Sequence, residues 1–181
     1  MSNDLTTLSG TEEAVWKTLQ DIAGDPRSPD RILALGTQSQ KGGGSVRMVV
    51  LRKADPANKT LVFYTHRRSG KVREIERNPG AEALYWNADH KLQIRLRGTV
   101  TISDGPDDVW DGFGEGTRAN YSASPAAGEV ISHPGQIGTG PDQAAFVVLT
   151  LTVFEVETLW LGGLVHHRAL FTKEKACWLA P

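Results

Sequence analysis

The hydrophobic pattern of the chain begins with a helical period and then changes to the period of strands. Val15, Leu19 and Ile22 recur at helical spacing behind segment 9–12, which resembles a capping box, so an amphipathic helix is predicted over residues 11–23. Short apolar segments follow, bounded by Gly, Pro, Asn and Asp, and this layout is typical of antiparallel strands joined by turns. The predicted strands cover residues 31–35, 46–51, 60–65, 81–86, 92–100, 146–160, 167–172 and 176–179.

Two of these strands differ in how their faces are composed. In segment 92–100, Leu92, Ile94 and Leu96 lie on one face, and polar residues stand between them, so one face is predicted to be buried and the other solvated. Segment 46–51 is apolar at all but one position, which predicts a strand that is covered on both sides. A second subunit could supply that cover.

Two further helical segments interrupt the strands. One covers residues 69–77, and a short one starts near Val109, behind the turn-like segment 105–108. Residues 114–143 are rich in Gly, Ser, Pro and Ala, and so long an irregular segment in a compact domain is typically functional or mobile. About seven strands with two to three helices predict a mainly β (α+β) fold built on an antiparallel barrel.

Length and composition suit one globular domain. The chain has 181 residues, of which 39% are hydrophobic and 23% charged, so a single domain over residues 1–181 is expected. Cys177 is the single cysteine, which excludes an intramolecular disulfide, and the polar start lacks the layout of a secretory signal. The longest apolar run, 144–149, is far shorter than the about 20 residues of a membrane helix. A cytoplasmic protein without a membrane span is therefore expected.

Charge is distributed unevenly along the chain. Residues 41–100 hold 13 lysines and arginines against 5 acidic residues, although the net charge of the whole chain is −1. Part of this charge is expected to be ordinary solvated surface, but the clustering favours an anionic ligand. Nucleic acid is disfavoured as that ligand, because the pI is about 6.5 and no zinc-finger, helix-turn-helix or ribonucleoprotein motif is present.

The helix that starts after residue 68 has the features of a phosphate site. A helix start offers unpaired backbone N–H groups and the positive end of the helix dipole. Ser69, Gly70 and Lys71 occupy this start, directly behind Arg67 and Arg68. The chain is therefore expected to hold a phosphorylated small molecule.

Several short motifs, taken in order, resemble the pyridoxamine 5′-phosphate oxidase family of flavin mononucleotide (FMN) proteins. The family's members are homodimers with a split β-barrel fold, so the same fold and a homodimer with FMN near the subunit interface are expected here. The resemblance extends over about residues 30–102 and 145–181. The motifs that carry it are segments 47–52, 63–65, 69–71, 160–163 and 178–181.

The resemblance implies FMN as cofactor and a set of residues that bind it. In this scheme Arg47 and Lys71 hold the phosphate, Gln93 lies near the flavin ring and Trp160 forms a wall beside it. Gly70 is a departure, because the family has an arginine at this position. On the residues alone, Trp160 is a plain core aromatic and Gln93 a solvated strand position. The implied cofactor-binding residues are Arg47, Met48, Val49, Val50, Leu51, Arg52, Tyr64, Thr65, Ser69, Gly70, Lys71, Gln93, Trp160 and Arg168.

The resemblance is weaker in the region that would bind substrate. The family has a lysine where Arg52 stands, and its terminal Arg-x-His motif is shortened here to residues 166–168. The implied substrate is pyridoxamine or pyridoxine 5′-phosphate, which would place the chain in pyridoxine metabolism. The candidate substrate-binding residues are Arg52, Arg118, Tyr121, Ser122 and His167.

Two functions follow from these motifs. The first is an FMN-dependent oxidoreductase that transfers a hydride from a small, phosphorylated substrate to the flavin. The second is an FMN-binding reductase, carrier or sensor without vitamin B6 oxidase activity, which the altered substrate positions favour. No catalytic acid or base is assigned. A metal site is not expected, because His166 and His167 are strand neighbours that point to opposite faces, and Cys177 reads as a small buried residue.

Overall fold

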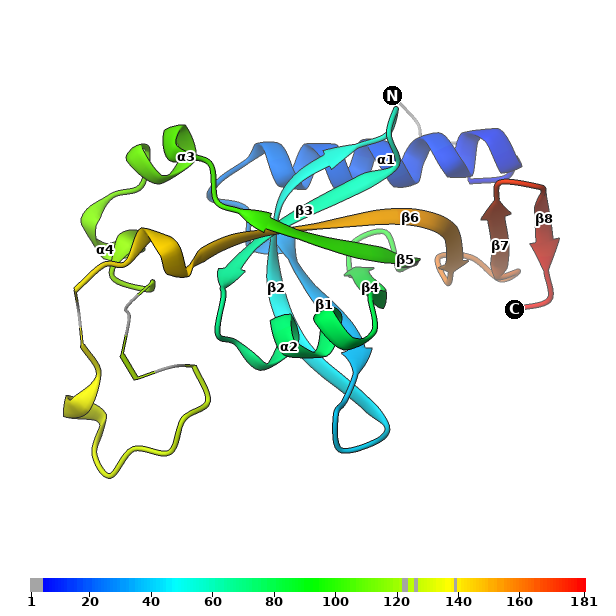
Figure 1. The fold of residues 1–181 in the computed structure, drawn as a ribbon. Coiled ribbons are helices and arrows are strands. Elements are labelled where there is room, and N and C mark those ends of the chain that lie inside the picture. The colour runs from blue at the N-terminus through cyan, green and yellow to red at the C-terminus, as the bar shows by residue number, and fades with distance from the viewer. Residues whose placement is uncertain (1–4, 122–123, 126, 139) are drawn as a thin grey trace.

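The computed structural model describes residues 5–121, 124–125, 127–138 and 140–181, and its main element is one antiparallel sheet of eight strands (Figure 1). The strands are β1 (Ile32–Gln38), β2 (Gly44–Asp55), β3 (Thr60–His66), β4 (Gly80–Asn87), β5 (Leu92–Asp104), β6 (Phe146–Trp160), β7 (His167–Thr172) and β8 (Ala176–Leu179). The α-helices are α1 (Leu8–Gly24), α2 (Gly70–Arg77), α3 (Asp107–Asp111) and α4 (Glu115–Arg118), and 3-10 turns cover Pro29–Arg31, Pro134–Gln136 and Gln143–Ala145.

The sheet closes on itself as a six-stranded barrel. Its strand order is β3-β2-β1-β4-β5-β6-β7-β8, and an additional pairing between β3 and β6 joins the ends of the first six strands. In that closing pair Phe63 lies opposite Leu149. Strands β7 and β8 extend the sheet beyond the barrel (Figure 1). The predicted mainly β fold, a split barrel with a few peripheral helices, is confirmed.

The barrel core is formed by residues of alternate strand positions together with two helices. Leu92, Ile94 and Leu96 of β5 are buried, as their alternation predicted. Helix α1 contributes Trp16, and α2 contributes Ile75, to the same cluster. These two helices lie on opposite sides of the barrel, α1 along the top of Figure 1 and α2 near the bottom.

Helix α1 starts earlier than predicted. It begins at Leu8, not near residue 11, and its N-cap is Thr7, whose Oγ1 accepts a hydrogen bond from the N–H of Gly10 at 3.1 Å. The expected capping box over residues 9–12 was wrong because these residues lie inside the helix, where the hydroxyl of Thr11 donates to the carbonyl oxygen of Thr7 at 2.7 Å. Among the described residues, no helix combines the length and apolarity needed to span a bilayer.

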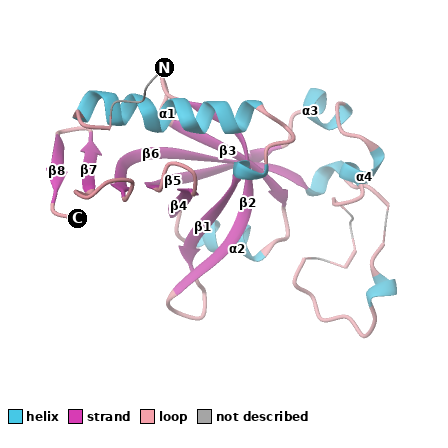
Figure 2. Cartoon of the chain, turned by 180° about the vertical axis from the view of Figure 1, so that it is seen from behind, coloured by secondary structure: helices cyan, strands magenta, loops and turns pink. Residues whose placement is uncertain are grey.

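The described part of the predicted irregular segment 114–143 extends outward from one end of the barrel (Figure 2). Its described part contains α4 and short 3-10 turns, and its start packs on a second apolar cluster outside the barrel. Trp110, Tyr121 and Phe146 form the centre of this cluster, with ring centroids 5.1 to 6.1 Å apart. The cluster fixes α3 against β6.

One expectation about β2 is not met within a single chain. Residues 46–51 were predicted to be covered on both faces, but Val46 and Met48 are 71% and 62% exposed. The reason is the pleat: Val49 and Leu51 point into the barrel, so Val46 and Met48 point outward.

Candidate functional site

The start of α2 lies beside β2 and the end of β3, and this arrangement gathers the polar side chains predicted for a phosphate. Strand β3 ends at His66, and the chain turns through Ser69, whose extended backbone (φ −72°, ψ 153°) makes it the N-cap of α2. Hydrogen bonds and charge interactions connect five side chains here. We call this group the helix-start cluster, and its members are Arg47, Thr65, Ser69, Lys71 and Glu74.

Arg47 is held rigidly in the cluster by four acceptors. Its Nη1 donates to the carbonyl oxygen of Leu35 at 3.1 Å and to Oγ1 of Thr37 at 2.5 Å. Its Nη2 donates to Oγ of Ser45 at 2.7 Å and to Oε2 of Glu74 at 2.6 Å. The guanidinium is therefore preorganised on the inner face of β2, at the end of the barrel that α2 covers.

Lys71 points into the same group. Its Nζ donates to Oγ1 of Thr65 at 2.9 Å and lies 3.5 Å from Oγ of Ser69. Burial lowers the pKa of Lys71, and the nearby charge of Arg47 lowers it further, while Glu74 opposes the shift. A partly buried cation with hydroxyl neighbours gains from a bound anion.

Glu74 belongs to the cluster, although the sequence analysis did not identify it. Burial alone would raise the pKa of this carboxyl, but hydrogen bonds from Thr37, Ser45 and Arg47 bring the pKa below its usual value. Its position three residues after Lys71 places both side chains on one helix face, a spacing that could have indicated it. Its partner Arg47 comes from a separate strand, which local spacing does not reveal.

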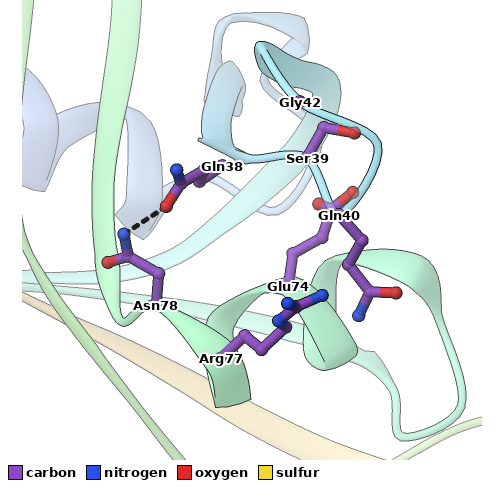
Figure 3. A pocket seen from close by; sticks show the side chains of 7 residues that line it. All are labelled: Gln38, Ser39, Gln40, Gly42, Glu74, Arg77 and Asn78. Atoms are coloured by element: carbon purple, nitrogen blue, oxygen red, sulfur yellow. Dashed lines mark hydrogen bonds between the residues drawn. The ribbon is translucent and has the colours of Figure 1, made fainter.

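A cavity of about 340 Å³ adjoins the cluster, between the tip of the β1–β2 hairpin and α2 (Figure 3). Figure 3 shows side chains of the hairpin and of the helix facing each other, with Nδ2 of Asn78 bonded to Oε1 of Gln38. Glu74 is shared between cavity and cluster. The cavity was missed because the hairpin tip reads from sequence as a flexible turn; its lining residues are Gln38, Ser39, Gln40, Gly42, Glu74, Arg77 and Asn78.

The apolar residues of β2 divide between the two faces of the strand. Val49 and Leu51 are buried in the barrel core, so only their backbone groups are available to a ligand. Met48 points outward, as does half-buried Val50. Of the predicted strand motif, Arg47 and Arg52 therefore carry the polar chemistry.

Two predicted substrate residues come together on the outside of the barrel. The guanidinium of Arg52 lies 5.2 Å from the centre of the Tyr64 ring. Burial raises the pKa of Tyr121, and the nearby charge of Arg52 opposes this rise. Burial and the charge of Arg31 lower the pKa of Arg52, whose Nε is buried without a hydrogen-bond partner among the described residues.

Arg118, a further candidate from the middle segment, is bonded elsewhere. Arg118 donates from Nε to the carbonyl oxygen of Trp110 at 3.2 Å and from Nη2 to that of Asp111 at 2.9 Å. Its guanidinium therefore links α4 to α3. Ser122 lies outside the described residues.

The remaining predicted residues lie on β5, β6 and β7, which extend away from α2 toward β8 (Figure 1). The ring of Trp160 lies 5.1 Å from that of His167, which lies 5.8 Å from that of Trp178. Arg168 donates from Nη2 to Oε1 of Glu157 at 2.9 Å. Gln93 is half-buried on the outer face of β5. No contact among the described residues joins Trp160, Arg168 or Gln93 to the helix-start cluster.

The motif at residues 160–163 has a structural explanation. A Cβ at Gly162 would lie 2.5 Å from Cε2 of Trp160, and a Cβ at Gly163 would lie 3.0 Å from Cη2 of the same ring. The two glycines therefore let the turn lie directly against the indole. This turn fixes the ring of Trp160 beside His167.

The donor set of the helix-start cluster fits a phosphate monoester. Arg47 and Lys71 supply positive charge, Thr65 and Ser69 supply hydroxyl groups, and the first turn of α2 supplies backbone N–H groups. Riboflavin, which lacks the phosphate, would offer these groups no anion to bind. The chemistry of the cluster thus agrees with a nucleotide that ends in a phosphate.

Comparison with known proteins gives one consistent family. The family described as pyridoxamine 5′-phosphate oxidase, FMN-binding domain, matches residues 13–104. A pyridoxine/pyridoxamine 5′-phosphate oxidase of Psychrobacter arcticus is 30% identical over 167 residues, which cover 78% of this chain and 73% of the relative. A protein of the same name from Nitrobacter hamburgensis is 38% identical over 98 residues, which cover 54% of this chain and 44% of the relative. The chain thus matches less than half the length of that second relative.

Solved structures show the same fold. A pyridoxamine 5′-phosphate oxidase-related FMN-binding protein of Nostoc punctiforme superposes with a TM-score of 0.75 at 22% identity, covering 94% of this chain and 96% of its own. PhzG from Burkholderia lata, solved in complex with tetrahydrophenazine-1-carboxylic acid, gives 0.77 at 23% identity, covering 94% and 91%. At these identities the similarity establishes the fold.

Proposed function

Because the chain belongs to the pyridoxamine 5′-phosphate oxidase family of FMN-binding domains, we propose that it binds FMN and acts as an FMN-dependent oxidoreductase. The observation that carries the proposal is the helix-start cluster. Its two cations and two hydroxyl groups converge at a helix start, as a phosphate monoester requires. The flavin, when bound, supplies the hydride-accepting chemistry.

The residues of the chain bind and orient in this proposal. Arg47 and Lys71 hold the phosphate, and Thr65 and Ser69 complete its hydrogen bonds. Arg47 is already fixed by Leu35 and its other acceptors, so it loses little conformational freedom on binding. No general acid or base is required of the protein, because positioning the donor carbon against the ring is sufficient for hydride transfer.

We propose that the substrate lies near Arg52, on the outer face of β2. Arg52, Tyr64 and Tyr121 together offer a cation and two phenol groups beside an aromatic cluster. This chemistry suits a small aromatic molecule that carries a phosphate, such as pyridoxamine or pyridoxine 5′-phosphate.

Arg118 supports the second candidate, an FMN-binding reductase, carrier or sensor without vitamin B6 oxidase activity. Its Nε and Nη2 donate to the carbonyl oxygens of Trp110 and Asp111, so the guanidinium serves to join α4 to α3. The two candidates differ in one assay: formation of pyridoxal 5′-phosphate from pyridoxamine 5′-phosphate by the FMN-loaded protein in the presence of oxygen.

We further propose that the protein is a homodimer with FMN near the subunit interface. Gln93, Trp160 and Arg168 belong to the expected flavin site, yet among the described residues of their own chain none of them bonds to the helix-start cluster. A partner subunit can bring these residues to the cluster. The exposed apolar side chains of Val46 and Met48 supply a surface for such a partner.

Purification and titration test the cofactor assignment. We expect a yellow protein that releases FMN on denaturation. Replacing Arg47 or Lys71 by Ala should weaken FMN binding by about 10- to 100-fold each, since a charged hydrogen bond contributes about 1.5–3 kcal/mol. Lys53→Ala is the matched control, because Lys53 lies on the same strand but is exposed. Unchanged FMN affinity in both cluster variants would contradict the assignment.

A further inference from the structure

Arg73 lies one turn into α2, and its side chain folds back over the start of the helix. Long helical side chains point toward the N-terminus of their helix and cover the residues three and four positions earlier. Nη1 of Arg73 donates to the carbonyl oxygen of Arg68 at 2.7 Å. Nη2 lies 3.9 Å from the point where a Cβ at Gly70 would stand. The guanidinium of Arg73 therefore lies beside Gly70, where residue 70 itself has no side chain.

This guanidinium forms part of the wall of a second cavity. The cavity has a volume of about 290 Å³ and lies between the hairpin tip and the start of α2. Nε2 of Gln40 donates to the carbonyl oxygen of Arg73 at 3.2 Å, which ties the hairpin tip to the helix. Glu74 lines the cavity and also accepts from Arg47, so the cavity adjoins the helix-start cluster. The lining residues are Ser39, Gln40, Lys41, Gly70, Arg73 and Glu74.

The charges around this cavity favour an anion. Lys41 and Arg73 face a single carboxylate, Glu74, whose Oε2 is already bonded to Arg47 and Thr37. Within the described part of the chain, no carboxylate forms an ion pair with Arg73. A planar guanidinium can donate two parallel hydrogen bonds to phosphate oxygens.

We propose that Arg73 binds the phosphate of FMN as a third cation beside Arg47 and Lys71. The inference rests on the proposed function, because it takes FMN as the ligand of the helix-start cluster. Gly70 contributes because it has no side chain, which leaves room at the helix start for the guanidinium of Arg73. Arg73 then contributes to the discrimination between FMN and riboflavin, which lacks the phosphate.

Equilibrium titration of the full chain with FMN and with riboflavin, followed by flavin fluorescence, tests this role. Arg73→Gln should lose about tenfold in FMN affinity, with riboflavin affinity unchanged, and the salt dependence of FMN binding should become shallower. Arg27→Gln is the matched control, because Arg27 is an exposed arginine that lines neither cavity beside α2. It should leave both affinities as in the wild type.

A double variant tests whether position 70 and position 73 reach the same space. A Cβ at residue 70 meets the Arg73 guanidinium at ordinary contact distance, so Gly70→Arg in the Arg73→Gln background should restore most of the lost FMN affinity. Wild-type FMN affinity in Arg73→Gln would overturn the proposal, as would an equal loss of riboflavin affinity, which would indicate a structural role. A wild-type protein that binds neither flavin would instead refute the proposed function, and the role of Arg73 with it.

Discussion

At the scale of single residues, the helix-start cluster balances two partly buried cations against one carboxylate. The charged form of Lys71 is destabilised in this arrangement, because burial and the charge of Arg47 lower its pKa. Glu74 remains ionised, since its hydrogen bonds from Thr37, Ser45 and Arg47 outweigh its burial. The carboxylate holds Arg47 in place in the free protein. A bound phosphate would then relieve the unfavourable burial of the lysine charge.

The lowered pKa of Lys71 gives FMN binding a predictable pH dependence. A phosphate dianion stabilises the protonated lysine, so binding is strongest below the pKa of Lys71 in the free protein and weakens as pH rises through that pKa. Because the pKa is lowered, the weakening should begin below the ordinary lysine range. FMN titrations at increasing pH measure it.

Lys71→Arg is the control for this pH profile. An arginine keeps its charge at every pH of the experiment, so the variant should show a flatter profile than the wild type at the alkaline end. Equal alkaline profiles in the two proteins would show that a group other than Lys71 governs the pH dependence.

At the scale of elements, a bulge between β5 and β6 sets how closely these two strands approach each other. Strand β5 shifts register between Arg97 and Gly98 where it pairs with β6. A Cβ at Gly98 would lie 2.1 Å from the carbonyl oxygen of Thr152 and 2.8 Å from its carbonyl carbon. Both are backbone atoms of the neighbouring strand, so the close approach of β5 and β6 at this bulge requires a glycine.

Gly98→Ala should therefore destabilise the barrel. The expected loss is about 2–3 kcal/mol in the free energy of unfolding, since the backbone of β6 must move to make room. Urea denaturation measures it as a lower midpoint.

Gly36→Ala is the matched control, because a Cβ at this strand glycine would lie 3.6 Å from the carbonyl oxygen of Glu82, an ordinary contact. Its unfolding free energy should stay within about 1 kcal/mol of the wild type. Similar losses in the two variants would mean that general strand propensity, and not the close approach at the bulge, is responsible.

The elements that follow from local pattern were predicted well. Residues 146–160, 167–172 and 176–179 form β6, β7 and β8 with the predicted bounds. Their alternation or apolar length is a property of the segment itself. The bulge at Gly98 and the N-cap at Thr7 were not predicted, because each depends on where one segment meets another group, and local periodicity does not contain that information.

The residues of the candidate site also divide into those that the sequence predicted and those that it did not. Arg47, Thr65, Ser69 and Lys71 were expected from motif order, and the structure brings them together at the start of α2. Glu74 was missed because its role depends on Arg47, 27 residues earlier in the chain. The cavities beside the hairpin were missed for a similar reason. Gln40 of the hairpin tip donates a hydrogen bond to α2 and so holds the tip beside the helix. In the sequence the hairpin tip is only a polar turn.

At the scale of the whole molecule, the outer face of the barrel carries an apolar row that the described residues leave exposed. The register places Met48 of β2 opposite Ala34 of β1, and Ala34 opposite Leu84 of β4. Met48 is 62% and Leu84 38% exposed, and Ile32 and Trp86 are exposed on the same strands. Three adjoining strands therefore present hydrophobic side chains on one surface, which is the kind of surface that forms an interface between subunits.

This surface connects the proposed dimer with the proposed cofactor. If a second copy covers the apolar row, then replacing Met48 and Leu84 together by Glu should produce monomers, because charged side chains would then be buried at the interface. Sedimentation velocity measures the change in mass. FMN affinity should fall in the same variant, since the residues of the expected site that do not reach the helix-start cluster, Trp160 and Arg168, would no longer be supplied by a partner.

The control for this variant must add the same kind of charge to an apolar position outside the row. Val130→Glu meets this requirement, because Val130 is fully exposed in the segment outside the barrel. It should leave both mass and FMN affinity unchanged. A monomeric Met48→Glu/Leu84→Glu protein with wild-type FMN affinity would support the apolar row as the dimer interface. It would contradict an FMN site that is completed by a partner subunit. A variant with the mass of the wild type would remove the apolar row from consideration as the interface.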